Sequence, residues 1–149
     1  MSVIMIRPAR TLDAGKLADM MGAANAQLEW LPKLYSGAEE IMLVGDMIGA
    51  GWVRTAYLDD VLAGFIARKG TEIHGLCVQP QLQGRGIARR LMVDAQRNAK
   101  KLGLWSYQAN DRATDFYLKA GFAEVIRTEG DDNDAKLPDI RFEWHRDTE

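Results

Sequence analysis

The sequence contains a single cysteine, Cys77, among its 149 residues. One cysteine cannot build an internal disulfide framework or a cysteine-rich zinc site, so no metal is expected. No apolar run approaches the ~20 residues that a membrane-spanning helix requires. The first ten residues are too short and too interrupted for a secretory signal peptide. These absences predict a cytoplasmic protein with no membrane partner.

A strong excess of charge of either sign is also lacking. The 19 lysine and arginine residues nearly balance the 21 aspartate and glutamate residues, which leaves a formal net charge of −2. This balance gives no global attraction to nucleic acid, so that partner is not expected. Hydrophobic residues make up 47% and charged residues 27%, as in ordinary globular proteins. Without repeats or linkers, residues 1–149 are predicted to form one domain.

The hydrophobic pattern alternates between strand-like and helix-like periods, which predicts an α/β protein with a mixed sheet. Strands are expected at residues 3–7, 52–58, 61–68, 71–78, 104–108, 122–128 and 140–145. Helices are expected at residues 11–28, 36–48, 84–102 and 110–121. Thr11 is the expected N-cap of the first helix, and Gly103 the expected residue just after the third. Within residues 71–78, an apolar spacing of three and then two residues predicts a bulge near Gly75.

Residues 78–92, V-Q-P-Q-L-Q-G-R-G-I-A-R-R-L-M, run from a strand end through a proline turn into an amphipathic helix. A helix N-terminus presents unpaired N–H groups and partial positive charge, so it suits a phosphate-sized anion. Gly84 and Gly86 leave the backbone bare where a pyrophosphate would approach. The segment lacks the Gly-Lys-Ser/Thr of a P-loop, and Arg89 stands where a dinucleotide-binding fingerprint needs glycine or alanine. A nucleotide-binding protein is therefore the least favoured interpretation.

Residues 83–88, Q-G-R-G-I-A, resemble the acyl-CoA loop of the GNAT superfamily of N-acetyltransferases, whose pattern is Q/R-x-x-G-x-G/A. Residues 110–122, N-D-R-A-T-D-F-Y-L-K-A-G-F, resemble that superfamily's N-x-x-A-x-x-F-Y-x-K-x-G-F segment. The resemblance implies a GNAT-like mixed, mostly antiparallel central sheet of six or seven strands flanked by about four helices. It also implies an acyltransferase that moves an acetyl group from acetyl-CoA to a primary amine.

The same resemblance implies that the loop backbone binds the cofactor pyrophosphate and that the preceding strand end binds the pantetheine arm. The implied cofactor-binding residues are Leu76, Cys77, Val78, Gln83, Gly84, Arg85, Gly86, Ile87, Ala88, Asn110 and Tyr117. Tyr117 is the expected general acid for the departing thiolate, and the Leu76 N–H is the expected oxyanion donor. Cys77 is expected to be a small buried hydrophobic residue rather than a nucleophile, because no base neighbours it.

Glu72 and His74 are the two candidates for a catalytic base. A base is useful because an amine of pKa ~10.4 is almost wholly protonated at pH 7. A strand period of two puts both side chains on one face. Some members of the superfamily place a catalytic glutamate six residues before the position of Val78, where Glu72 stands here. Ordered water is the alternative to both residues, which would then be solvated polar residues of an open strand.

Trp30, Asn133 and Trp144 are expected to line the acceptor pocket, through a resemblance to a bacterial GNAT subgroup. Its elements are W-L/M-P, L-W-x-F-Q-x-N and G-x-x-N-E-x-x-P-D-x-x-Y/F-x-W. Ordinary core or sheet-edge packing is the alternative for the two tryptophans. Residues 129–134, E-G-D-D-N-D, lack the spacing of a calcium loop. They form either a solvated hairpin loop or an acidic rim that attracts a cationic amine.

The sequence thus predicts acetylation of a small-molecule or peptide amine by direct attack, since no residue is arranged for a covalent acyl-enzyme. The alternative is a catalytically silent acyl-CoA-binding or sensor module, which would need the loop but neither Tyr117 nor Glu72. GNAT domains often pair, so a homodimer is one expected state. The identity of the acceptor amine cannot be read from the sequence.

Overall fold

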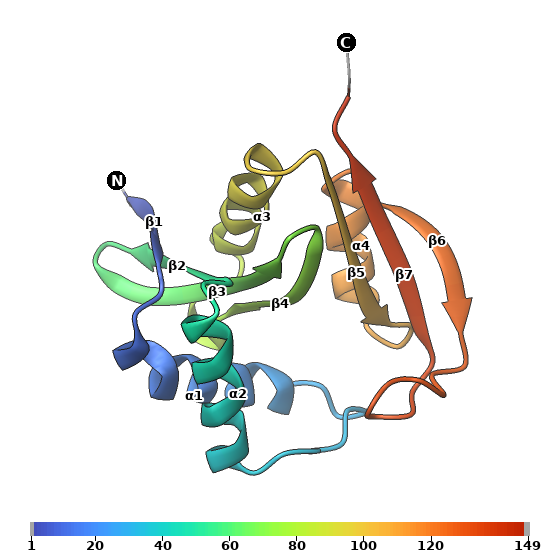
Figure 1. The fold of residues 1–149 in the computed structure, drawn as a ribbon, viewed down its shortest axis with the longest axis horizontal. Coiled ribbons are helices and arrows are strands. Elements are labelled where there is room, and N and C mark those ends of the chain that lie inside the picture. The colour runs from blue at the N-terminus through green and yellow to red at the C-terminus, as the bar shows by residue number, and fades with distance from the viewer. Residues whose placement is uncertain (1, 148–149) are drawn as a thin grey trace.

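The structure, a computed structural model, describes residues 2–147, and a single sheet lies at its centre (Figure 1). The sheet has seven strands in the order β1-β2-β3-β4-β5-β7-β6. They are β1 Ile4–Pro8, β2 Val53–Leu58, β3 Val61–Lys69, β4 Glu72–Val78, β5 Lys101–Tyr107, β6 Ala123–Thr128 and β7 Asp139–His145. Neighbouring strands are antiparallel except for β4 and β5, which are parallel. This mixed, mostly antiparallel sheet confirms the predicted fold class.

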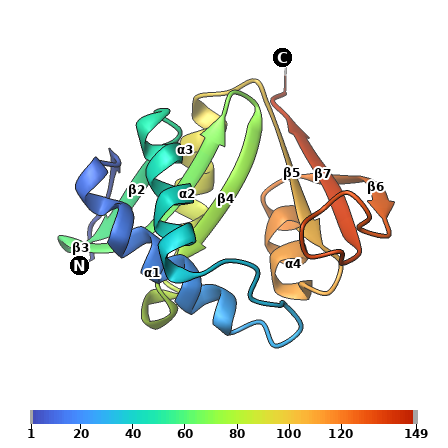
Figure 2. The ribbon, with the colours of Figure 1, turned by 60° about the horizontal axis from the view of Figure 1, so that its bottom comes forward.

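Helices cover both faces of the sheet. In the part of the chain that the structure describes they are α1 Ala14–Ala26, α2 Gly37–Gly49, α3 Ile87–Arg97 and α4 Asp111–Lys119, with two short 3-10 turns at Thr11–Asp13 and Pro80–Leu82. Helices α1 and α2 lie on one face, and α3 and α4 lie on the other (Figure 2). The helices therefore agree with the predicted number and with a three-layer arrangement.

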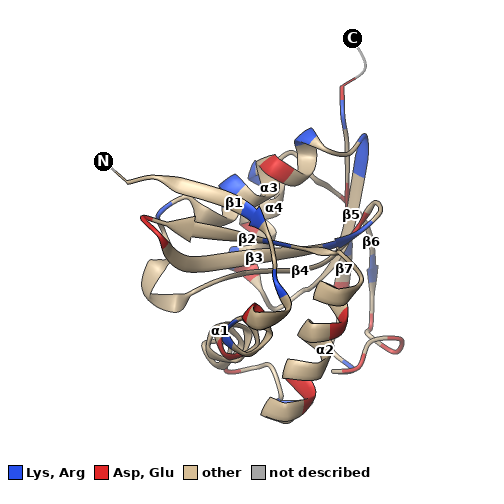
Figure 3. Ribbon diagram, turned by 60° about the vertical axis from the view of Figure 1, so that its left-hand side comes forward, with Lys and Arg blue, Asp and Glu red and all other residues tan. Residues whose placement is uncertain are grey.

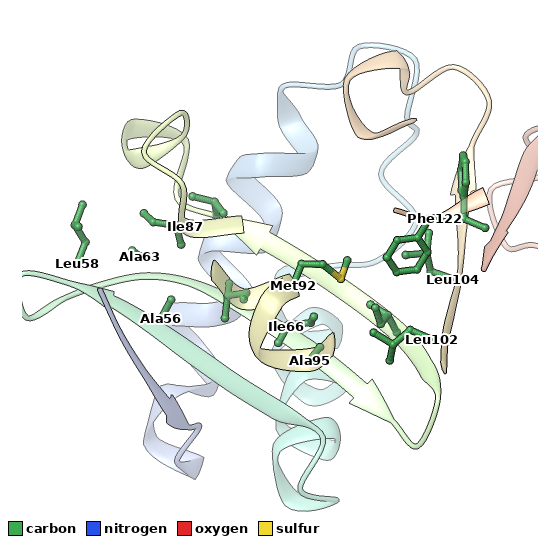
Figure 4. Close-up of a cluster of buried hydrophobic side chains, with 14 of the residues drawn as sticks. Ala56, Leu58, Ala63, Ile66, Ile87, Met92, Ala95, Leu102, Leu104 and Phe122 are labelled. Atoms are coloured by element: carbon green, nitrogen blue, oxygen red, sulfur yellow. The ribbon is translucent and has the colours of Figure 1, made fainter. Parts of the chain in front are cut away.

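The larger hydrophobic core lies between the sheet and the α3–α4 layer. Its buried side chains come from β2, β3, β4, α3, β5 and β7, so the core joins strands on both sides of the β4–β5 boundary. Figure 4 shows Ile66 of β3, Met92 of α3 and Leu102 of β5 within this cluster. A second cluster, which includes Leu17 of α1 and Val44 of α2, lies on the opposite face.

Short local motifs form the start of α2 and the turn between β2 and β3. The Ser36 hydroxyl accepts a hydrogen bond from the Glu39 N–H at 3.2 Å, and the Glu39 carboxylate accepts one from the Ser36 N–H at 2.9 Å. The two bonds form a capping box at the start of α2, where the sequence predicts a helix from residue 36. Asp59 and Asp60 join β2 to β3 with φ values of 48° and 69°, as a tight hairpin turn requires.

Two helix boundaries were predicted wrongly. Helix α3 ends at Arg97, because the Asn98 side-chain amide donates to the carbonyl of Asp94 at 2.7 Å and closes the last turn. The chain then enters β5, so Gly103 is a strand residue and not the residue after a helix. Helix α1 begins at Ala14 and is preceded by a 3-10 turn, so Thr11 is not its N-cap.

The predicted bulge in β4 is confirmed. Ala67 of β3 pairs with Gly75, while the next residue, Arg68, pairs with Ile73. His74 is therefore the extra residue of β4 in this ladder. Separately, none of the helices within residues 2–147 has the length and apolar character needed to cross a membrane.

Candidate active site

Strands β4 and β5 separate along their length, and a cleft opens beside the end of β4. Their register contains one pair, Glu72 with Gly103, at the start of β4. The Gly103 N–H donates to the Thr71 carbonyl at 2.8 Å and closes this same end. Beyond it the two strands diverge (Figure 2). The cleft is lined by the end of α1, the end of β4, the turn before α3, α3 and α4. Its volume of about 1090 Å³ lies just above the usual range of small-molecule pockets, so an extended ligand has room.

The edge of β4 presents backbone donors to this cleft. The Gln79 N–H donates to the Ala63 carbonyl at 2.8 Å, which makes these two residues a hydrogen-bonded pair. Such pairs alternate along an antiparallel ladder, so the N–H groups of Leu76 and Val78 are turned away from β3. These two N–H groups point toward the side on which β5 diverges from β4. A ligand lying along β4 would meet two donors spaced as in an added strand.

The turn before α3 forms the next part of the cleft wall. Gly84 and Gly86 have φ values of 81° and 82°, in the left-handed region that favours glycine. A Cβ at either position would find no atom within 4 Å, so the backbone faces open space. Gly86 is the N-cap of α3, whose first-turn N–H groups have no partner within the helix. This arrangement has room and donors for a pyrophosphate.

The residues next to these glycines differ in burial and in whether they line the cleft. Ile87 is buried and fixes the start of α3 in the core, while Ala88 is half-buried beside the cleft. Arg89 borders the cleft one turn further along. Arg85, although it stands between the two glycines, is exposed and does not line the cleft.

Gln83 connects three elements at the cleft mouth. Its side-chain amide donates to the side-chain oxygen of Gln27 at 3.0 Å and to the Val78 carbonyl at 3.4 Å. Its own side-chain oxygen accepts from Arg112 of α4 at 3.4 Å. Asn110 also borders the cleft, and its side chain caps α4 by accepting from the Ala113 N–H at 3.1 Å.

Tyr117 reaches the cleft from the inner face of α4. Its ring packs against Phe116, Phe122 and Phe142, with centroids 5.6, 5.9 and 5.6 Å away. Burial in this aromatic environment raises the pKa of the Tyr117 phenol to about 12. The hydroxyl is therefore protonated throughout the neutral range and can act as a proton donor.

Cys77 borders the cleft but packs toward the α1–α2 cluster. Burial raises the pKa of its thiol to about 12, so the thiol is neutral at physiological pH. A neutral thiol is a poor nucleophile, since the thiolate is the reactive form.

Glu72 and His74 lie outside the cleft lining. The Glu72 carboxylate accepts a hydrogen bond from the Arg141 guanidinium at 2.7 Å, in an ion pair from β4 to β7. The exposed imidazole of His74 is stacked on Trp52, with centroids 5.2 Å apart and ring planes at 19°. The catalytic base therefore stays a prediction, because the structure brings neither side chain to Tyr117.

The three residues predicted for the acceptor pocket fall in two places. Trp30 makes an edge contact with Tyr107 at the end of β5, with centroids 5.6 Å apart. The Asn133 side-chain amide donates to the Leu137 carbonyl at 2.7 Å and to Asp139 at 3.1 Å, within the β6–β7 loop. Trp144 is five residues beyond Asp139 on β7, about 17 Å along the strand, and packs against the larger core.

The acidic loop 129–134 meets the segment between α1 and α2 (Figure 1). The Tyr35 hydroxyl donates to the Asp134 carboxylate, and this bond raises the pKa of Tyr35. In Figure 3 the ribbon of this loop is red at its aspartate and glutamate positions. The contact ties the two segments together, and Trp30 of the first segment lies at the end of β5.

Part of the cleft wall was missed in the sequence. The end of α1, with Asn25 and Gln27, and Arg112 of α4 border the cleft. Arg112 occupies a variable position of the N-x-x-A motif, so the motif gave no signal for it. The α1 residues carry no motif, and their place depends on how α1 packs beside the end of β4. Within residues 2–147, no cluster of three or more His, Cys, Asp and Glu side chains is arranged to hold a metal ion.

Known proteins share both the sequence and the fold. A family model described as an acetyltransferase (GNAT) domain matches residues 46–141. A Salmonella typhimurium protein named peptidyl-lysine N-acetyltransferase YjaB is 31% identical over 133 residues, covering 87% of this chain and 90% of its own. The solution structure of apo-form YjaB from Escherichia coli is 26% identical, with a TM-score of 0.78 over 95% of this chain and 97% of that chain.

A further structure shares the fold alone. It is a GCN5-related N-acetyltransferase from Rhodopseudomonas palustris, 23% identical, with a TM-score of 0.82 over 98% of each chain. The family model spans well over half of this chain and includes both the glycine turn and α4. The chain therefore belongs to the GNAT family of acetyltransferases, and it is an N-acetyltransferase whose acetyl donor is acetyl-CoA.

Proposed function

We propose that this enzyme transfers the acetyl group of acetyl-CoA to a primary amine by direct attack in the cleft bordered by β4, α3 and α4. One observation carries the proposal. The outward N–H groups of β4, the open glycine turn before α3 and the phenol of Tyr117 border the same cleft. An extended acyl thioester with a pyrophosphate would meet the anion site at the glycine turn, then the backbone edge of β4, and then the proton donor Tyr117.

In this proposal the backbone of Gly84 and Gly86, with the first turn of α3, binds the pyrophosphate. The pantetheine arm lies along β4 as a short added strand. The N–H of Leu76 donates to the thioester oxygen as negative charge develops there. A fixed backbone donor of this kind stabilises the transition state without reorganising during the reaction.

Tyr117 protonates the departing thiolate. A phenol with a pKa of about 12 is a weak acid toward a thiolate whose conjugate acid has a pKa of ~8.5 in water. The gap of about 3.5 units corresponds to about 5 kcal/mol against complete transfer. Desolvation of the same cleft raises the pKa of the departing thiol too and narrows this gap. We therefore expect proton donation to accompany thiolate departure rather than to precede it.

The acceptor amine must lose a proton before it attacks, because its pKa is ~10.4 in water. Glu72 is engaged by Arg141 and His74 by Trp52, and neither side chain borders the cleft. We therefore assign deprotonation to water. Substitutions at Glu72 and His74 test the two residues predicted from the sequence.

We propose a lysine side chain of a protein or peptide as the acceptor. The support is the Salmonella relative, named a peptidyl-lysine N-acetyltransferase, which matches this chain across most of both lengths. The loop with Glu129, Asp131, Asp132 and Asp134 lies against the segment that follows α1, whose end borders the cleft, and its negative charge would attract a cationic amine. Trp30 and Asn133 lie on this side of the molecule, whereas Trp144 does not adjoin them.

An acceptor screen tests the proposal. Purified enzyme is incubated with acetyl-CoA and with lysine peptides, polyamines or amino acids, and free coenzyme A is measured by thiol detection. Lysine peptides should release coenzyme A, and the same peptides with pre-acetylated lysines should not. If calorimetry shows that acetyl-CoA binds but no acceptor leads to release of coenzyme A, the result would instead favour a catalytically silent acyl-CoA-binding module.

We further propose that the chain works in the cytoplasm as one domain. The basis is its single cysteine and the absence of a membrane-spanning helix among the described residues. A homodimer is an expectation from the family alone, and sedimentation of the purified protein would test it. Cell fractionation tests the location.

A further inference from the structure

The two halves of the sheet meet at a single point. One half is β1 to β4, the other is β5 to β7, and only the pair Glu72 and Gly103 is in register across the boundary. At this point the Arg141 guanidinium reaches from β7 across β5 to the Glu72 carboxylate at 2.7 Å. It is the one ion pair in residues 2–147 that joins the halves. The side chains of Arg141 and Glu72 are 19% and 32% exposed, so solvent screens the pair only in part.

Gly103 makes this crossing feasible. A Cβ on Gly103 would lie 2.1 Å from one terminal nitrogen of Arg141 and 2.7 Å from its central carbon. The guanidinium therefore lies directly over the glycine, and any side chain at this position would require the guanidinium to shift. Gly103 has no positive φ value that would by itself require glycine. A glycine inside a strand commonly marks a close approach of this kind.

Two more contacts hold the guanidinium in place. Its Nε approaches the Glu143 carboxylate at 3.4 Å, and its centre lies 5.7 Å from the centroid of the Trp105 ring. Glu143 and Trp105 pair with Gly103 and Arg141, respectively, across the β5–β7 ladder. Arg141 is thus fixed on the C-terminal half of the sheet, and Glu72 is its contact on the N-terminal half.

We propose that the Glu72–Arg141 ion pair is a clamp that sets how far β4 and β5 separate, and that Glu72 is a positioning residue. Leu76 is four residues from Glu72, about 13 Å along β4. A rotation of roughly 5° about the clamp would move the Leu76 N–H by about 1 Å relative to Tyr117 on α4. Displacements of this size can lower a catalytic rate about a hundredfold.

The clamp proposal rests on the proposed function. It predicts that breaking the ion pair lowers kcat and leaves the acetyl-CoA dissociation constant nearly unchanged. The glycine turn is attached to α3 and not to β5, so it keeps its place when the clamp is broken. Arg141→Ala and Glu72→Gln should each lower kcat tenfold or more with a lysine peptide as acceptor. The acetyl-CoA dissociation constant, measured by calorimetry, should change by less than about threefold in both variants.

A double-variant cycle separates a clamp from a catalytic base. If both residues act through their contact, the double variant should be about as slow as either single variant. The shape of the pH–rate profile should be unchanged in all three proteins. A base at Glu72 would instead give a changed pH limb in Glu72→Gln and near wild-type turnover in Arg141→Ala, which would overturn the clamp. If Arg141→Ala does not fold, Arg141→Gln replaces it.

Gly103→Ala provides a second test. The added methyl group should displace the guanidinium, so this variant should be as slow as Arg141→Ala. In the Arg141→Ala background, Gly103→Ala should lower kcat no further, because the guanidinium that the methyl group would displace is already absent. An equal loss in both backgrounds would contradict the crossing over Gly103.

Arg127→Gln is the matched control, since Arg127 pairs with Glu124 on the exposed strand β6, away from the cleft. It should keep wild-type constants. A wild-type protein that binds no acetyl-CoA would reject the proposed function. An active wild type with unchanged clamp variants would reject the clamp alone.

Discussion

The ring of Tyr117 on α4 lies against the ring of Phe142 on β7, with centroids 5.6 Å apart and ring planes at 46°. Phe142 is fully buried, so it holds the phenol in one place at the border of the cleft. This contact couples α4 to the C-terminal half of the sheet. Tyr117 can therefore serve as a fixed proton donor opposite the edge of β4.

Removing the hydroxyl should damage turnover and spare binding. Tyr117→Phe keeps the aromatic packing and removes only the donor, so kcat should fall about a hundredfold or more. The acetyl-CoA dissociation constant should stay within a small factor, because the lost proton transfer belongs to the transition state. Tyr57→Phe on β2, remote from the cleft, is the control. Near wild-type turnover, with chemistry shown to limit the rate, would remove Tyr117 from the role of acid.

The pH dependence of the rate follows from the raised pKa of Tyr117. A general acid must be protonated to act, and this phenol stays protonated until the pH approaches about 12. The rate should therefore rise with pH as the acceptor amine deprotonates, with no alkaline decline up to the limit of protein stability. An alkaline decline below about pH 10 that disappears in Tyr117→Phe would show that the phenol titrates far lower than its burial implies.

Cofactor affinity should depend on charge at the glycine turn. Aspartate and asparagine tolerate the left-handed conformation of Gly86 about equally, so Gly86→Asp and Gly86→Asn differ mainly in charge. A carboxylate about 5 Å from a phosphate costs roughly 3 kcal/mol at an intermediate dielectric, so Gly86→Asp should bind acetyl-CoA at least a hundredfold more weakly than Gly86→Asn. Calorimetry measures both affinities. Gly51→Asp, at another left-handed glycine outside the cleft, controls for backbone strain. Equal acetyl-CoA affinities in the two Gly86 variants would show that the pyrophosphate does not bind at this turn.

Cys77 should react slowly with thiol reagents in the folded protein. Burial raises the pKa of its thiol to about 12, so little thiolate is present at pH 8. Labelling with iodoacetamide should be slow in buffer and fast in urea, and Cys77→Ala should keep turnover within a small factor. Loss of turnover in a folded Cys77→Ala variant would show that the thiol takes part in catalysis.

The same thiol should weaken the fold at alkaline pH. The pKa of the Cys77 thiol is higher in the folded protein than in the unfolded chain, so the thiol of the unfolded chain ionises first as pH rises. The neutral thiol therefore contributes its full stabilisation of the folded state below pH ~8.5, and this contribution declines as pH rises toward 12. By pH 10 the free energy of unfolding should fall by up to about 2 kcal/mol from this group. Urea unfolding at pH 7 and pH 10 measures the decline, and Cys77→Ala should show less of it.

Features that depend on neighbouring residues in the chain could be predicted from the sequence. The glycine turn, the cap at Asn110, the Asp59–Asp60 hairpin and the bulge in β4 each follow from a few consecutive residues. The end of α3 was misjudged, because the inward-facing Leu102 of β5 continues the helical spacing of Ala95 and Ala99. The spacing of hydrophobic residues therefore cannot show where α3 ends and β5 begins.

Contacts between distant segments could not be read from the sequence. Glu72 was predicted as a base from its position before Val78, and its partner Arg141 is 69 residues away. Gly103 was assigned to a helix end, while its structural place lies beneath that ion pair. Gln27 reaches the cleft only because α1 packs beside the end of β4. Each of these depends on how elements distant in the chain pack together, which local patterns do not specify.

The most direct test of the cleft as the active site is a crystal structure of the enzyme with acetyl-CoA. We expect the pantetheine arm along β4 with hydrogen bonds from the N–H groups of Leu76 and Val78, the pyrophosphate at Gly84 and Gly86, and the sulfur within reach of the Tyr117 hydroxyl. Acetyl-CoA bound outside the cleft bordered by β4, α3 and α4, or with its sulfur remote from Tyr117, would contradict the account.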